Sequence, residues 1–255
     1  MAAQDTIGIV TTNIQNKTAT VTFGHPASNS FPRNLLDKLT AEIHKLSSNQ
    51  EVSVIVLQSQ GNGAFCAGAS FDELLAVQTL DQGTHFFSGF AHLLNAMRNC
   101  SQIIVGRVQG KAVGGGVGII AACDYVFATV SSAIKLSEIA IGIGPFVIEP
   151  AVSHKIGKTA MSQLALAPHA WKTAPWANEK GLYSEVFDNQ ENLDENLNSF
   201  VEKLASYHPQ ALQELKKVLW EGTENWDTLL LQRAQVSGKL VLSDFTKNAL
   251  SQFKK

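Results

Sequence analysis

The first strands of the chain are predicted by alternating β-branched and polar residues. The stretches TIGIVTTNI and TATVTFG flank Gln15-Asn16-Lys17, an arrangement typical of a β-hairpin. A continuous apolar run at 52–59 predicts a strand that is covered on both faces. Further strands are predicted at 102–109, 125–130 and 133–141.

Helices are predicted where apolar residues recur at helical spacing. Pro32 opens the first helix, and Ser70 with Glu73 forms a capping box for the second. The third helix carries six apolar residues on one side, which are Phe86, Phe87, Phe90, Leu93, Leu94 and Met97. Short helices are expected within 147–181. Strands and helices together predict a mixed α/β fold.

The polar segment DNQENLDEN, at 188–196, separates two parts of the chain that differ in character. Everything after it has helical spacing, and its apolar residues form more surface than an isolated helical tail can hide. We therefore expect a core at 1–190 and a helical region at 191–255. The helical region should pack on the core and on a neighbouring subunit.

Composition and charge exclude several classes of partner. The 255 residues include 20 Lys and Arg against 22 Asp and Glu, without a basic block that would bind nucleic acid or anionic lipid. The N-terminus has no basic segment before a long apolar run, and Lys111 and Asp124 bound the most apolar stretch, so neither secretion nor a membrane span is predicted. Three cysteines without metal-ligand spacing, Cys66, Cys100 and Cys123, indicate reduced packing residues in a cytoplasmic protein.

Four glycines in five positions distinguish the stretch AVGGGVGIIAACD at 112–124. A phosphate-binding loop is excluded, because the pattern around IGKT at 156–159 requires a glycine where the chain has Val152. The stretch 116–121 does fit the dinucleotide-binding pattern G-x-G-x-x-A, and the acidic Glu138 follows about 20 residues later. Against this alternative, the apolar segment ends at Cys123 and is short for a crossover helix.

The glycines fit better as the start of a helix that stabilises an anion. Main-chain N–H groups in the first turn of a helix lack partners within it, so they can donate to an oxygen that gains negative charge. Glycine lets such an oxygen come close to the backbone. An oxyanion hole usually needs a second donor, and Ala67-Gly68-Ala69, between a predicted strand and a capped helix, offers similar backbone.

Three ordered segments of the chain together resemble a known family. The stretches GAFCAGASFDELL and GKAVGGGVGIIAACDYVFA, followed by KLSEIAIGIGP, are similar to the enoyl-CoA hydratase/isomerase family, also called the crotonase family. The similarity covers nearly the whole chain, and 135–157 resembles the methylglutaconyl-CoA hydratase branch. The resemblance implies an α/β spiral of ββα turns with two roughly perpendicular sheets, and a helical C-terminal region that builds trimers or hexamers.

The resemblance also implies roles for individual residues. The oxygen of an acyl-CoA thioester would accept hydrogen bonds from the backbone N–H groups of Ala69 and Gly115, and Glu138 would be the catalytic carboxylate. Coenzyme A is part of the substrate, so neither a separate cofactor nor a metal is expected. The expected substrate contacts are Ala67, Gly68, Gly114, Gly118 and Phe146, and further candidates for an acyl pocket are Phe90, Trp171 and Trp176.

The chain departs from the family at a position where many hydratases carry a first glutamate, which is Gly118 here. The possible substitutes are Asp72, Glu73 and Glu149. A single glutamate can hydrate a 2-enoyl thioester if it both binds and deprotonates the water, and it can also move a double bond from C3 to C2. We expect a hydratase. The alternatives are a Δ3-Δ2-enoyl-CoA isomerase and a catalytically silent acyl-CoA binding protein.

Overall fold

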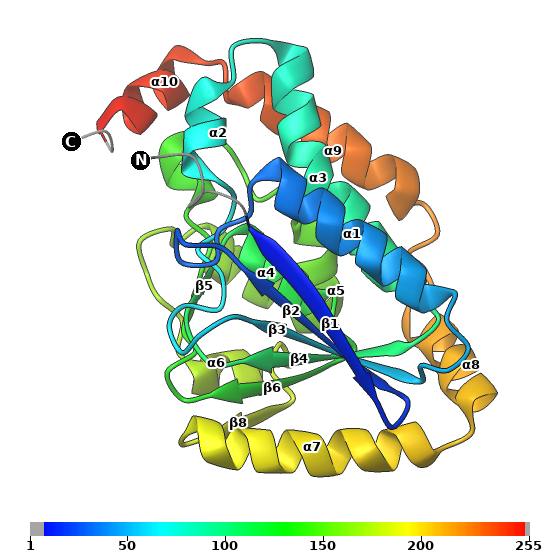
Figure 1. Ribbon diagram of the computed structural model, residues 1–255. Coiled ribbons are helices and arrows are strands. Elements are labelled where there is room, and N and C mark those ends of the chain that lie inside the picture. The colour runs from blue at the N-terminus through cyan, green and yellow to red at the C-terminus, as the bar shows by residue number, and fades with distance from the viewer. Residues whose placement is uncertain (1–7, 253–255) are drawn as a thin grey trace, which may run out of the picture.

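A six-stranded sheet runs through the centre of the computed structural model, which describes residues 8–252 (Figure 1). Its strand order is β1-β2-β3-β4-β6-β8, and every neighbouring pair is parallel except β1 with β2. A smaller parallel sheet pairs β5 with β7. The strands are β1 (Ile9–Gln15), β2 (Thr18–Gly24), β3 (Val54–Ser59), β4 (Ile103–Val108), β5 (Ala112–Val113), β6 (Tyr125–Thr129), β7 (Ile134–Lys135) and β8 (Glu185–Phe187).

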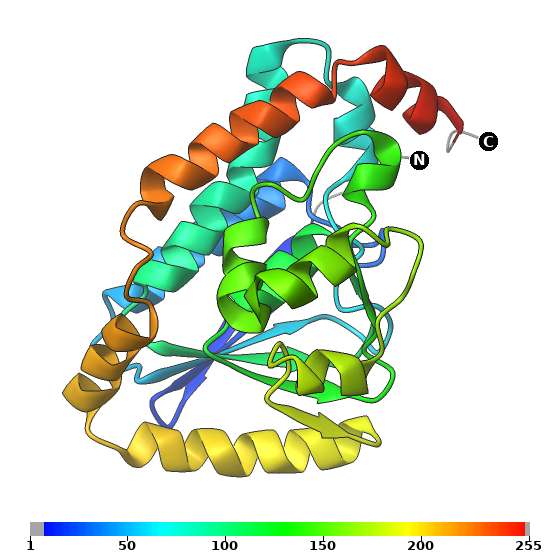
Figure 2. The same ribbon diagram turned by 180° about the vertical axis from the view of Figure 1, so that it is seen from behind.

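Helices cover both faces of this sheet, and Figure 2 shows α3 and α9 running side by side. No helix within residues 8–252 is long and apolar enough to cross a membrane. The helices in these residues are α1 (Arg33–Ser47), α2 (Phe71–Ala76), α3 (Leu80–Asn99), α4 (Gly115–Ala121), the 3-10 helix η1 (Glu138–Ile141), α5 (Glu149–Ala165), α6 (Ala174–Glu179), α7 (Gln190–Ser206), α8 (Pro209–Leu219), α9 (Trp226–Leu240) and α10 (Asp244–Ser251).

The predicted hairpin is confirmed by β1 and β2, which pair antiparallel with Gln15 opposite Thr18. Asn16 and Lys17 form the turn with φ of 50° and 64°, the positive values that a tight two-residue hairpin turn requires. The first two residues of the predicted stretch, Thr6 and Ile7, lie outside the described residues.

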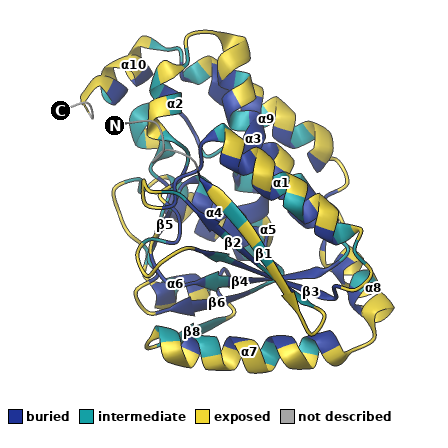
Figure 3. Cartoon of the chain, in the orientation of Figure 1, coloured by how far each residue is buried: buried dark blue, intermediate teal, exposed yellow. Residues whose placement is uncertain are grey.

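Strand β3 is covered on both faces, as its continuous apolar run predicts. Val54 and Val56 pack in a cluster with α7, whereas Ile55 and Leu57 belong to the main core with α1, α3 and α4. Figure 3 shows α4 buried and α7 exposed along its outer face. The helix that carries the glycine run therefore lies inside the molecule, between the sheet and the outer helices.

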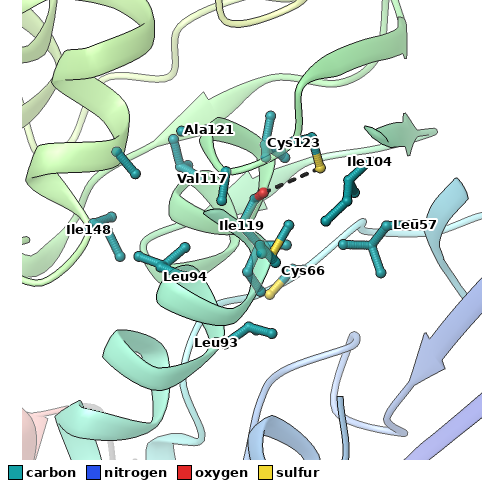
Figure 4. Packing of buried hydrophobic residues seen from close by; sticks show 14 of the residues in the cluster. Leu57, Cys66, Leu93, Leu94, Ile104, Val117, Ile119, Ala121, Cys123 and Ile148 are labelled. Carbon is teal, nitrogen blue, oxygen red and sulfur yellow. Dashed lines mark hydrogen bonds between the residues drawn. The ribbon is translucent and has the colours of Figure 1, made fainter. Parts of the chain in front are cut away.

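All three cysteines are buried free thiols, as expected for packing residues. Figure 4 shows Cys66 and Cys123 among the apolar side chains around α4, where Cys123 Sγ lies 3.4 Å from the carbonyl oxygen of Ile119. Burial raises the pKa of both thiols to about 12. Neither thiol is therefore a nucleophile near neutral pH.

The strand predicted at 133–141 is wrong for most of its length. Only Ile134 and Lys135 pair in β7, and the chain then turns into η1 at Glu138. Gly142 ends η1 with a φ of 81°, and a Cβ there would lie 2.5 Å from Thr246 Oγ1 in α10. The turn that carries Glu138 is thus held by a glycine and by the C-terminal helix, which the strand-like pattern does not reveal.

The predicted capping box at Ser70 forms only in half. Ser70 Oγ accepts a hydrogen bond from the backbone N–H of Glu73, but the Glu73 carboxylate accepts one from the backbone N–H of Arg33 instead. A complete capping box occurs at Thr79 and Gln82, where α3 begins. The Arg33 contact ties α1 to α2, a long-range interaction that a local pattern cannot predict.

The C-terminal region is helical throughout α7–α10, as expected, and it packs on the core. Helix α9 approaches α3 so closely that a Cβ on Gly83 would lie 2.7 Å from the carbonyl oxygen of Gly238. Helix α5, which precedes this region in the sequence, is longer than the short helices expected within 147–181, and it is kinked at Gly157. The division at residue 190 and contact with a neighbouring subunit stay predictions.

Candidate active site

The three segments that carry the sequence motifs lie side by side. The backbone N–H of Val113 donates to the carbonyl oxygen of Cys66 at 2.9 Å. The N–H of Gly114 donates to the backbone carbonyl oxygen of Lys135 at 3.0 Å. These bonds place the start of α4 between the Ala67-Gly68-Ala69 segment and the strand that leads to Glu138. Segments far apart in the sequence are thereby brought into one site.

A cavity of about 160 Å³ opens where the three segments meet. Six of the residues predicted to form the site line it together, which are Ala67, Gly68, Ala69, Gly114, Gly115 and Glu138. Most of the other lining side chains are apolar, among them Phe86, Phe87, Phe90, Ile141, Val147 and Ile148. An apolar cavity with a few polar groups is typical of a small-molecule site.

Two backbone donors in this cavity are unused. Within residues 8–252, the N–H groups of Ala69 and Gly115 donate to no protein acceptor. Their neighbours do have acceptors: the N–H of Gly68 points to Cys66 Sγ, and that of Ser70 donates to the carbonyl oxygen of Phe31. A pair of free N–H groups in one apolar cavity can bind an oxygen that gains negative charge.

Glycine is required at both residues that begin α4. Gly114 has a φ of 54°, and a Cβ on it would lie 2.8 Å from Glu138 Oε1. A Cβ on Gly115 would lie 2.2 Å from Cε1 of Phe90. The bare backbone thus lets a carboxylate and an aromatic ring lie directly against the helix start.

Glu138 is the carboxyl group in the cavity, and its environment favours the protonated form. Burial raises its pKa from 4.5 to about 7, although backbone hydrogen bonds at Glu138 and Ser137 act in the opposite direction. The Oε2 atom is buried and has no hydrogen-bond partner in the protein. At neutral pH the group is therefore poised to take up and release a proton.

The other expected pocket residues lie elsewhere. Among residues 8–252, Gly118 and Phe146 are absent from the cavity lining. Gly118 faces α5, because a Cβ on it would lie 2.4 Å from Cγ2 of Ile148, and the Phe146 ring covers Gly144. Trp171 lies beneath the ammonium groups of Lys111 and Lys135, away from the lining. Phe90 does line the cavity; Trp176 does not.

None of the three proposed substitutes for the first glutamate lines the cavity within the described chain. Glu149 accepts hydrogen bonds from Ser153, Lys158 and Arg233. Burial raises its pKa, but these partners outweigh the burial and hold the pKa below 4.5. Glu149 therefore ties α5 to α9 as a paired carboxylate, and Glu138 is left as the lone carboxyl group lining the cavity in residues 8–252.

The contact between Gly118 and Ile148 gives a direct prediction for stability. Gly118→Ala should lower the free energy of unfolding by about 1–3 kcal/mol, because the added methyl group overlaps the Ile148 side chain. Thermal unfolding would measure the effect. Gly63→Ala is the matched control, since nothing lies within 4 Å of a Cβ at that position. Equal melting temperatures for the two variants would contradict the contact.

Two serines in the cavity lining, Ser137 and Ser237, are not among the site residues that the sequence predicts. Ser137 comes directly before Glu138 in the chain, so the position of Glu138 also brings Ser137 to the cavity. Ser237 belongs to α9, and the apolar pattern of α9 gives no sign of which element its buried face meets. The cavity therefore also takes a residue from the C-terminal helical region.

The comparison with protein families decides the relationship. A family model described as enoyl-CoA hydratase/isomerase matches residues 13–254. The chain belongs to the enoyl-CoA hydratase/isomerase family. This confirms the resemblance drawn from the three segments. The chain is thus a hydratase/isomerase family enzyme, and its relatives include proteins named as hydratases and as isomerases.

Individual relatives of this family member carry both kinds of name. The short-chain-enoyl-CoA hydratase of Clostridium acetobutylicum is 25% identical, over 94% of this chain and 92% of that protein. The peroxisomal Delta(3,5)-Delta(2,4)-dienoyl-CoA isomerase of Arabidopsis thaliana is 22% identical, over 88% of this chain and 84% of that protein. The mitochondrial methylglutaconyl-CoA hydratase of Rattus norvegicus is 32% identical over 117 residues, 46% of this chain and 37% of that protein.

Solved structures confirm the crotonase fold. The crystal structure of enoyl-CoA hydratase from Bacillus halodurans superposes with a TM-score of 0.88 at 22% identity, covering 95% of this chain and 99% of that chain. At this level of identity the likeness shows the fold alone.

Proposed function

We propose that this enzyme adds water across the double bond of a 2-enoyl-CoA thioester. The observation that carries the proposal is the meeting in one cavity of two unpartnered backbone donors and a carboxyl group with a pKa of about 7. In this assignment Ala69 and Gly115 form the oxyanion hole, and Glu138 is the catalytic residue.

One carboxylate suffices for every proton transfer in this reaction. Ionised Glu138 accepts a proton from a water molecule as the water oxygen bonds to C3 of the enoyl group. The electron pair of the double bond moves toward the thioester oxygen, where the N–H groups of Ala69 and Gly115 stabilise the negative charge. Glu138 then returns the proton to C2, the thioester carbonyl re-forms, and the carboxylate is regenerated.

The relatives support hydration over isomerisation. Three mitochondrial methylglutaconyl-CoA hydratases match at 31–32% identity over 117 residues, and the Clostridium hydratase aligns over almost the full chain. These matches agree with the resemblance to that branch.

A specific observation favours an isomerase as the second candidate. Glu138 is the lone carboxyl group lining the cavity within the described residues, and most of its surroundings are apolar. Moving a double bond from C3 to C2 needs one base that removes a proton at C2 and returns it at C4. The Arabidopsis dienoyl-CoA isomerase among the relatives is consistent with that chemistry.

The proposal is tested with crotonyl-CoA, 3-methylglutaconyl-CoA and 3-hexenoyl-CoA as substrates. We expect the purified protein to form 3-hydroxyacyl products from at least one of the first two thioesters. Conversion of 3-hexenoyl-CoA to 2-hexenoyl-CoA without any hydration would favour the isomerase. Tight binding of all three thioesters without turnover would indicate an acyl-CoA binding protein.

The pH dependence of the reaction should follow Glu138. Burial raises its pKa to about 7, and the ionised form is the base, so kcat/KM should rise with pH until about 7 and then level off. The measurement is kcat/KM for the preferred thioester across the pH range in which the fold is stable. A flat profile from pH 5 to 9 would contradict the role of this group.

We also infer that the enzyme assembles as a homotrimer or a hexamer. Helix α8 supports this inference, because Leu215, Val218 and Leu219 are half or more exposed. Light scattering coupled to size-exclusion chromatography measures the assembly directly.

A further inference from the structure

The cavity contains a second polar side-chain atom without a partner. Ser237, on the buried face of α9, is 1% exposed, and its Oγ atom makes no hydrogen bond to the protein. A buried serine within a helix can donate to the carbonyl oxygen four residues earlier, but this hydroxyl does not. It lines the same cavity as Glu138, Ala69 and Gly115.

Contacts at different points along α3 separate Ser237 from the proposed oxyanion hole. Gly83 of α3 touches Gly238, the residue next to Ser237, whereas Phe90 of α3 touches Gly115. Phe90 follows Gly83 by seven residues, which is about 10 Å along a helix. The rings of Phe86 and Phe87 line the cavity between these two points.

A hydroxyl at that distance from the oxyanion hole affects which acyl chain binds. In the free protein this hydroxyl has no partner among the described residues, which is unfavourable in an apolar surrounding. A purely alkyl chain leaves it unpaired. A chain with an oxygen at the same place would supply the missing hydrogen bond.

We propose that Ser237 selects acyl groups that carry an oxygen at the end remote from the thioester. The inference rests on the proposed function, because that function places the thioester at Ala69 and Gly115. Ser237 is in this role a specificity-determining residue, distinct from the catalytic Glu138. A neutral hydroxyl oxygen fits best, because a carboxylate in this mostly apolar lining would lose its hydration with a single serine as partner.

The test is binding of saturated thioesters, which the enzyme cannot turn over. Hexanoyl-CoA is compared with 5-hydroxypentanoyl-CoA and glutaryl-CoA, and octanoyl-CoA with 7-hydroxyheptanoyl-CoA and pimeloyl-CoA, by titration calorimetry. At the chain length that reaches Ser237, an oxygen-bearing thioester should bind about tenfold more tightly than its alkyl counterpart. The hydroxyl and carboxylate members of each set identify which oxygen is preferred.

Ser237→Ala should remove this preference by weakening binding of the oxygen-bearing thioester, while binding of the alkyl thioester should change little. Its melting temperature should stay the same or rise, because an unpaired buried hydroxyl is lost. Ser88→Ala is the matched control, since that buried hydroxyl donates to the carbonyl oxygen of His85 and lies outside the cavity lining. It should lower the melting temperature and leave the preference intact.

Two results would overturn the role of Ser237. One is a wild-type protein that prefers the alkyl thioester at both chain lengths. The other is a Ser237→Ala variant that binds all thioesters more weakly by the same factor. Because binding is measured without turnover, a protein that shows the preference but hydrates nothing would contradict the proposed hydration alone.

Discussion

Glu138→Gln should lower turnover of the preferred enoyl-CoA at least about 100-fold, the effect expected when a general acid or base is lost. The glutamine side chain has nearly the same shape but cannot exchange the proton that the reaction moves. Binding of a saturated acyl-CoA should change little, because the oxyanion donors of Ala69 and Gly115 are retained. The measurement is kcat for both forms, with calorimetric binding beside it.

Glu149→Gln is the matched control for this variant. The Glu149 carboxylate is paired with Lys158 and Arg233 and lies outside the cavity lining. The Glu149→Gln protein should therefore be less stable than the wild type but keep most of its turnover. Near-wild-type turnover of Glu138→Gln would exclude Glu138 as the catalytic residue. An equal loss of turnover in both variants would point to a structural effect instead.

The stability of the wild type should fall as pH rises through the titration of Glu138, and the stability of Glu138→Gln should not. The carboxyl pKa rises from 4.5 to about 7 on folding, so the folded protein binds the proton more tightly than the unfolded chain. Below pH 4.5 both states are protonated and no stability is lost through this group. As pH rises to 7 and above, the wild type loses up to about 3 kcal/mol, which the glutamine variant does not lose.

Removing either oxyanion donor should reduce turnover about 100-fold to 1000-fold. A side-chain substitution at Gly115 cannot test this cleanly, because any Cβ there overlaps the Phe90 ring. Exchange of the backbone amide of Gly115 or Ala69 for an ester removes the N–H and adds no side chain. Neither N–H donates to an acceptor within residues 8–252, so the loss of donor should cost little stability.

An ester at Ala112 is the control for this exchange. The N–H of Ala112 donates to the carbonyl oxygen of Ala133, so its removal should lower the melting temperature by breaking a structural hydrogen bond. Turnover of that form should be largely retained. Wild-type turnover in folded esters at both Ala69 and Gly115 would remove these amides from the reaction.

The sequence predicts much of this site because its parts carry local signals. Glycines at 114 and 115 indicate a helix start that leaves N–H groups free. The small residues at 67–69 indicate a second segment where a ligand oxygen can come close to the backbone. That these two segments and Glu138 share a cavity was a prediction from the family resemblance. The hydrogen bonds from Val113 to Cys66 and from Gly114 to Lys135 are the physical reason that they meet.

The remaining features depend on contacts between distant segments. Gly118 lies one turn beyond Gly115, and helical spacing alone places both on one face, yet Ile148, the residue just before α5, occupies the space beside Gly118. The turn into η1 depends on Gly142 and on α10 behind it. Ser237 reaches the cavity because α9 crosses α3 at two glycines, a packing that no local pattern encodes.

Incorporation of labelled oxygen is the most direct measurement of whether this enzyme adds water. Crotonyl-CoA, 3-methylglutaconyl-CoA and 3-hexenoyl-CoA are incubated separately with the protein in H₂¹⁸O, and the products are analysed by mass spectrometry. Hydration through Glu138 predicts a 3-hydroxyacyl product with one ¹⁸O at C3 from at least one of the first two thioesters, and no label above background with Glu138→Gln. Recovery of both 2-enoyl thioesters unlabelled and intact, alongside rapid and label-free conversion of 3-hexenoyl-CoA to 2-hexenoyl-CoA, would contradict hydration and establish an isomerase.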